Sequence, residues 1–270
     1  MHRTRPAAVL AFLAAVTIAA SPVAATGPLS PEQVDAVRSY VRDTLEQLGV
    51  PGAAVVIVGV EGIEFAEGFG NARDDGTKAT PQTPFEVASL SKQLTSIGAM
   101  QLVISGDLSL DATVRSYADW FGADGSETAK ITVRDLVAQT SGFSEHQGVT
   151  NRIDEYGADD AVERNVRRLS AEGPEHSIGK FEYSNANYDI LGYLIAVASG
   201  QSYDAYMTEH VLGPLQMTHT HLTDAAARAD GVARATTRSL AVPSPMTSRL
   251  CAGAFPPASS RRAPRTSAMS

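Results

Sequence analysis

The chain has 270 residues, of which 43% are hydrophobic and 19% charged, a composition that supports a packed core and excludes global disorder. Its 30 acidic residues against 22 basic residues give a formal charge of −8. No nucleic-acid partner is expected, because phosphate binding needs a concentrated basic face. The single cysteine, Cys251, excludes an intrachain disulfide framework and a cysteine-based zinc cluster.

Residues 1–25 have the pattern of a secretory signal peptide. Arg3 and Arg5 precede an apolar stretch from Ala7 to Ala20, and small residues at 23–25 offer a cleavage site. The alternative is a retained membrane anchor, which the shortness of this stretch disfavours. No apolar run of about 18 residues follows, so we expect a soluble secreted or periplasmic protein without stable membrane insertion.

The first elements after this leader are a helix and a hairpin. The sequence at 30–33 is typical of a capped helix start, with Ser30 as the cap, Pro31 as the first helical residue and Gln33 three residues after the cap. Gly49 ends the helix. A β-branched run at 52–60 and an alternating run at 63–69 then predict two strands with one buried face.

The middle of the chain is mostly helical. Thr132 can cap one helix, and Asp159 or Asp160 can cap another. Apolar residues at helical spacing predict helices at 89–105, 133–138, about 161–170, 187–199 and 203–212. A hairpin followed by a helical stretch indicates an α+β fold whose sheet needs more strands.

The last 40 residues differ from the rest. Residues 231–270 contain six arginines and no acidic residue, and prolines interrupt the chain from Pro243 onward. No strand or helix period survives there, so we predict an irregular tail at 241–270 that takes no part in the sheet.

The first chemical signal is Ser89 with Lys92 at the start of an apolar-faced helix. Residues three apart share one helix face, so a lysine there can take the serine proton. The motif alone is weak, because Ser177 and Lys180 repeat it in an apparent loop. The alternative is that Ser89 is an ordinary helix cap beside a solvated lysine.

The second signal is the sequence Tyr183-Ser184-Asn185, which precedes another apolar helix. A tyrosine facing a lysine can exist partly as phenolate and act as general base and acid. Asn185 can bind a substrate amide or hold the lysine. The alternative is that Tyr183 only packs and Asn185 only caps the helix.

Several stretches in order resemble one family, the serine β-lactamases and penicillin-binding proteins, in the branch of class C β-lactamases, D-alanyl-D-alanine carboxypeptidases and related esterases. They are 83–92 (TPFEVASLSK), 106–111 (GDLSLD), 131–143 (ITVRDLVAQTSGF), 181–185 (FEYSN) and 213–218 (GPLQMT). The resemblance implies an antiparallel sheet flanked by helices, with a mostly helical subdomain.

By this resemblance Ser89 is the nucleophile, Lys92 its partner, Tyr183 the acid/base and Asn185 a substrate-positioning residue. It implies a hydrolase that forms an acyl-enzyme with a β-lactam, a D-alanyl peptide of peptidoglycan or an ester. It implies no cofactor and no metal, and His219 and His221 are interpreted as a solvated loop because no third ligand is nearby.

The chain departs from the family pattern at two places. Gln139 stands where the family commonly has histidine before Thr-Ser-Gly, and we expect this replacement to have no catalytic cost. No Lys-Thr-Gly occurs, and the lone His-x-Gly, at 146–148, precedes Tyr183. We therefore predict a partial hydrolase domain at 26–240, truncated or frame-shifted, without its last strands and with impaired activity. The alternative function is a non-catalytic remnant or a module that binds cell-wall peptides.

Overall fold

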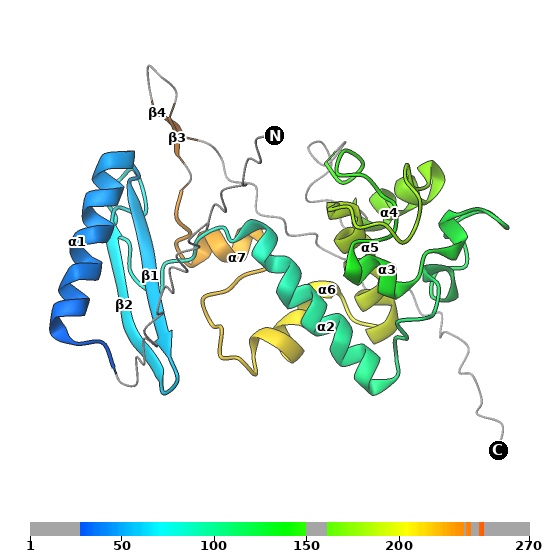
Figure 1. The fold of residues 1–270 in the computed structure, drawn as a ribbon, viewed down its shortest axis with the longest axis horizontal. Coiled ribbons are helices and arrows are strands. Elements are labelled where there is room, and N and C mark those ends of the chain that lie inside the picture. Colours follow the sequence, from blue (N-terminus) through cyan, green and yellow to red (C-terminus); the bar gives the residue numbers. More distant parts are fainter. Residues whose placement is uncertain (1–27, 150–160, 235, 239–242, 246–270) are drawn as a thin grey trace, which may run out of the picture.

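The computed structural model describes residues 28–149, 161–234, 236–238 and 243–245. Figure 1 shows a hairpin with one covering helix at one end of the molecule and a group of helices at the other end. The long helix α2 (Ser91–Ser105) runs between them. The predicted signal peptide at 1–25 and the predicted caps Asp159 and Asp160 lie outside the described residues.

The helix α1 (Pro31–Leu48) begins as its sequence predicts. The Ser30 hydroxyl accepts the Gln33 backbone N–H, and the Gln33 side chain accepts the Ser30 N–H, which completes a capping box. Gly49 ends the helix in the left-handed conformation, with φ of 63°. The predicted helix over 31–48 is therefore confirmed.

The strands β1 (Gly52–Gly59) and β2 (Gly62–Gly70) form the predicted antiparallel hairpin, with an irregular register between Ile57 and Val58. Phe65 and Phe69 are buried on one face, whereas Val58 on β1 is exposed. The helix α1 is fastened to β2 by Arg38, whose guanidinium lies 2.7 Å from the Glu67 carboxylate and 5.9 Å from the Phe65 ring centroid. One face of the hairpin is thus covered, as predicted.

The helical region forms the main hydrophobic core. Its helices are α2, α3 (Val133–Ala138), α4 (Ala161–Glu172), α5 (Asn185–Ser199), α6 (Tyr203–Met207) and the π-helical turn η4 (Thr208–Leu212). The largest fully buried side chains of this region include Leu136, Ile190, Leu194 and Met207 of the helices, and Phe121 and Phe143 of the segments that connect them. Because α5 is apolar nearly all round, it lies at the centre of this region and packs against α2, α3, α4 and α6.

The segment that leads into α2 is held by the chain that follows α7 (Asp224–Ala229). The backbone N–H of Ala233 donates to Pro84 O at 2.8 Å, and that of Arg234 donates to Ala72 O at 2.9 Å. Residues from the last described part of the domain therefore fix the approach to Ser89.

The predicted irregular tail is wrong in one place. Strand β4 (Pro243–Pro245) pairs antiparallel with β3 (Thr236–Arg238). Proline tolerates this position because a strand at the edge of a ladder can lack N–H donors. The β3–β4 pair is separate from the β1–β2 sheet, so the described part of the tail adds no strand to the main hairpin, as we predicted.

Two predicted helix starts are shifted. The helix α5 begins at Asn185 and its cap is Ser184, whose hydroxyl accepts the Ala186 N–H. The helix α2 begins at Ser91, after the short 3₁₀ turn η1 (Ala88–Leu90) that contains Ser89.

Within the described residues, no helix has the length and apolar character required to cross a membrane.

Candidate active site

Ser89 lies in a turn that the preceding residue shapes. Ala88 has a φ of 44°, in the left-handed region that a residue with a Cβ seldom adopts. This reversal directs the chain from the segment at 81–87 into η1 and then into α2. Ser89 is therefore a residue of the 3₁₀ turn and not the cap of α2, which contradicts the alternative that it is an ordinary helix cap.

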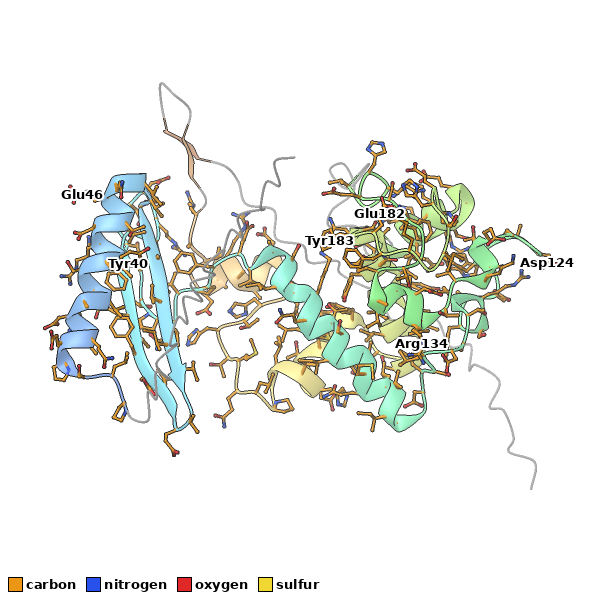
Figure 2. The ribbon with its side chains drawn as sticks, viewed as in Figure 1. Tyr40, Glu46, Asp124, Arg134, Glu182 and Tyr183 are labelled. Atoms are coloured by element: carbon orange, nitrogen blue, oxygen red, sulfur yellow. The ribbon has the colours of Figure 1, made fainter. Side chains whose placement is uncertain are left out.

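The Ser89 hydroxyl contacts two titratable side chains. Its Oγ lies 2.6 Å from the Tyr183 hydroxyl and 3.2 Å from Lys92 Nζ. Figure 2 shows Tyr183 on the side of the helical region that faces the start of α2. The structure thus brings together three of the residues predicted from sequence, although Tyr183 is 94 positions from Ser89.

Lys92 also contacts the fourth predicted residue. Its Nζ donates to Asn185 Oδ1 at 2.6 Å and lies 4.9 Å from the Tyr183 ring centroid and 5.6 Å from that of Tyr188. Two aromatic faces and an amide oxygen favour a positively charged ammonium here. Asn185 is therefore a partner of Lys92, and the alternative that it caps α5 is wrong because Ser184 occupies the cap.

The electrostatics of this cluster favour ionisation of Tyr183. Burial raises the pKa of the phenol, whereas hydrogen bonds with Lys92 and Ser89 and the charge of Lys92 lower it. The lowering effects are the larger, so the pKa of Tyr183 lies below the usual value for tyrosine. A phenolate that faces the Ser89 hydroxyl can accept its proton.

The start of η1 offers a donor for a developing oxyanion. Ser89 is the second residue of this 3₁₀ turn, where backbone N–H groups have no acceptor within the helix. Such an N–H can donate to a carbonyl oxygen bound above the Ser89 hydroxyl.

Three large apolar side chains close in sequence to Ser89 or Tyr183 are exposed, namely Val87, Leu90 and Phe181. A hollow of about 420 Å³ is lined by residues 81–88 and Ser91, on either side of Ser89 in the sequence, and by Tyr203 and residues 219–222. Ser89 itself is not among its lining residues.

The residues next to Tyr183, at 182–184 (the tyrosine segment), are held by side chains that were not predicted from sequence as site residues. The Ser184 hydroxyl donates to Ser144 O at 2.7 Å, and the Ser184 backbone N–H donates to Gln139 Oε1 at 2.9 Å. The only signal for Gln139 in the sequence is its position directly before Thr140-Ser141-Gly142.

The other candidates from sequence lie apart from this cluster. Ser177 and Lys180 are in a turn, as expected, with no helix between them. His219 and His221 both bond to the same carboxylate oxygen of Asp230, at 2.9 and 2.6 Å. Both histidines lie in a loop, as interpreted, and the His219 side chain is half exposed. Among the described residues, no cluster of three or more histidine, cysteine or acidic side chains could hold a metal ion.

Comparisons with known proteins agree with this geometry. The protein flp of Staphylococcus aureus (strain MW2) is 33% identical over 198 residues, which are 71% of this chain and 38% of that protein. A class C β-lactamase structure superposes with a TM-score of 0.68 at 25% identity, covering 82% of this chain and 59% of the other. The structure of D-alanine carboxypeptidase AmpC from Burkholderia cenocepacia gives 0.65 at 26% identity, covering 81% and 58%.

This chain therefore spans well under two thirds of the length of these proteins. The family model described as Beta-lactamase matches residues 37–258, most of the chain. The contacts among Ser89, Lys92 and Tyr183 lie within that match, in a fold shared with class C β-lactamases. The chain belongs to the β-lactamase family of serine hydrolases.

Proposed function

We propose that this protein cleaves an acyl donor through a covalent acyl-enzyme on Ser89. The observation that carries the proposal is the convergence of Tyr183 OH and Lys92 Nζ on Ser89 Oγ, at 2.6 and 3.2 Å. A serine hydroxyl is a weak nucleophile until an adjacent base accepts its proton. The lowered pKa of Tyr183 supports its assignment as that base.

The reaction follows from these contacts. Tyr183 phenolate accepts the Ser89 proton while Oγ bonds to the carbonyl carbon of the substrate, and the Ser89 N–H stabilises the oxyanion. Tyr183 then donates the proton to the leaving group as the bond to it breaks. Water then attacks the acyl carbon while Tyr183 accepts its proton, the bond from that carbon to Ser89 Oγ breaks, and Tyr183 returns the proton to Oγ. Lys92 remains charged throughout, held by Asn185, and stabilises the phenolate.

Three substrate classes share the carbonyl that this chemistry needs. They are β-lactams, D-alanyl peptides of peptidoglycan and simple esters. The signal-like residues 1–25 support a place outside the cytoplasm, where peptidoglycan is accessible.

Active-site labelling tests the proposal. The full chain is incubated with a fluorophosphonate, a fluorescent penicillin and a phenyl ester, and the adducts are mapped by mass spectrometry. We expect the label on Ser89 and its loss in Ser89→Ala. Ser177→Ala is the matched control, because Ser177 also precedes a lysine by three residues. An adduct that persists in Ser89→Ala would refute the assignment.

The second candidate is a module that binds cell-wall peptides without turnover. In this candidate, Ser89, Lys92 and Asn185 bind the peptide through hydrogen bonds alone. Calorimetric binding of a D-alanyl peptide to wild type and to Ser89→Ala, with no adduct in either, would favour this candidate over the hydrolase.

A further inference from the structure

Gln139 occupies an unusual position directly beneath the tyrosine segment. It ends α3 in the left-handed conformation, with φ of 60°, and its side chain is buried, with 7% of the residue exposed. Its backbone oxygen accepts the Glu182 N–H at 2.9 Å, and its side-chain oxygen accepts the Ser184 N–H at 2.9 Å. One residue therefore holds both neighbours of Tyr183.

A second side chain fixes the direction of the Gln139 amide. Asn187 Nδ2 donates to Gln139 Oε1 at 2.6 Å, and the Asn187 side chain is also hydrogen-bonded to Ser141. Gln139 Oε1 thus accepts two donors, one on each side of the start of α5. Asn187 is fully buried, so these bonds do not exchange readily with water.

Tyr183 itself depends on this support. Its residue is 39% exposed, so packing alone does not fix its ring, whereas its backbone is held on both sides by Gln139. A displacement of about 1 Å in a reacting group can lower a rate about 100-fold. The 2.6 Å contact between Tyr183 OH and Ser89 Oγ is short enough to be lost by such a shift.

We propose that Gln139 is a positioning residue, which sets the Tyr183 hydroxyl against Ser89 through the Glu182 and Ser184 backbone N–H groups. The inference rests on the proposed function, and it adds a role for Gln139 to our expectation that glutamine in place of histidine here has no catalytic cost. Its side chain supplies the acceptor that directs Ser184, and its backbone, turned by the positive φ, supplies the acceptor for Glu182.

Two substitutions of Gln139 test whether the position of its side-chain acceptor, and not only the presence of a polar group, is required. Gln139→Asn keeps an amide and suits a positive φ, but withdraws the acceptor by about 1.5 Å, one C–C bond. Gln139→His restores an acceptor nitrogen at greater reach without a fixed charge. Gln101→Asn is the matched control, because the Gln101 side chain also makes a tertiary hydrogen bond to backbone, from Nε2 to His210 O at 3.0 Å, and that partner lies outside residues 182–187.

The first readout needs no substrate: the titration of Tyr183, followed by ¹³C NMR of labelled tyrosine. In Gln139→Asn we expect the Tyr183 pKa to rise towards the usual value, because the phenol moves away from Lys92 and Ser89. We expect Tyr183 to titrate in Gln139→His and in Gln101→Asn as it does in wild type. A Tyr183 titration unchanged in a folded Gln139→Asn would overturn the proposal. Should that variant not fold, Asn187→Ser replaces it, with the same expected rise and the same refutation.

The second readout is acylation of Ser89. We expect the rate to fall about 10- to 100-fold in Gln139→Asn and to stay within about 3-fold of wild type in Gln139→His and Gln101→Asn. Equal losses in Gln139→Asn and Gln101→Asn would assign Gln139 a structural role only and overturn the proposal. A wild type that is never acylated would refute the proposed function, and the titration of Tyr183 would still test Gln139.

Discussion

Lys92 and Tyr183 are expected to act as a single unit on Ser89. Replacing Lys92 with Met removes the ammonium but keeps a flexible chain of similar length, and Tyr183→Phe removes only the hydroxyl. Both lost groups contact the same atom, Ser89 Oγ, so both changes interrupt one proton transfer. Losses within one such step do not multiply.

The magnitude follows from these contacts. General base catalysis typically contributes about 10²–10⁴ in rate, so each single variant should lose about that much, equivalent to about 3–5 kcal/mol. Lys92→Met should approach the loss of Tyr183→Phe, because the lysine is a principal cause of the lowered Tyr183 pKa. The double variant should therefore lose little more than the worse single variant, which gives a coupling free energy of about 3–5 kcal/mol.

The assay is the rate of Ser89 acylation by an activated phenyl ester, measured by stopped-flow release of the phenol for wild type, both singles and the double variant. Thermal unfolding of each variant separates misfolding from lost chemistry. If the double loss equals the product of the single losses, about 10⁴–10⁸, the two groups act independently and the shared-proton argument is refuted.

Three further results are expected. Acylation should rise with pH as Tyr183 ionises, with a midpoint below the ordinary tyrosine pKa of about 10, and a pH-independent rate would contradict its role as base. Ala88→Gly should raise the free energy of unfolding in urea by about 0.5–1 kcal/mol, because glycine adopts the φ of 44° without strain, and a loss of stability would contradict this. Hydrogen bonds from His221 and His219 lower the pKa of Asp230, so they stabilise the fold above the unfolded carboxyl pKa of about 3.9. Asp230→Asn should therefore be less stable than wild type at pH 7, and the difference should shrink as the pH falls through the folded pKa. A difference that persists at pH 2 would show that another cause dominates.

The local elements were predictable because their signals lie within a few residues. The capping box at Ser30 and the glycine at 49 fix α1, and the alternation at 63–69 fixes β2. The start of α2 was not predictable in this way, because the positive φ of Ala88 creates the 3₁₀ turn and alanine gives no sequence signal for it. Backbone strain of this kind is held by tertiary contacts and is not encoded locally.

The same distinction applies to the site. Ser89, Lys92, Tyr183 and Asn185 were named from motifs, and the structure brings them together. The role of Gln139 could not be named, because its three bonds reach residues 43 to 48 positions away, a separation that no helical or strand period covers. The second strand of the tail pair was missed because its two prolines argue against a strand unless it lies at an edge.

The four candidate residues lie on or next to two packed helices, and none of them lies on the β1–β2 hairpin. Ser89 lies in η1 and Lys92 in the first turn of α2, whereas Tyr183 directly precedes the cap of α5 and Asn185 is its first residue. The helices α2 and α5 pack directly on each other. Ser96 and Tyr188 add a side-chain hydrogen bond of 3.0 Å between them, one turn beyond the site.

On the inner face of α2, a Cβ added to Gly98 would lie 2.7 Å from Met207 Sδ, so this glycine lets α2 approach the helix that follows α5 closely. The distances from Ser89 to Tyr183 and Lys92 are thus set by the packing of buried helices in the main core. The β1–β2 hairpin contributes none of the four candidate residues, so its stability and the alignment of the nucleophile are governed by different contacts.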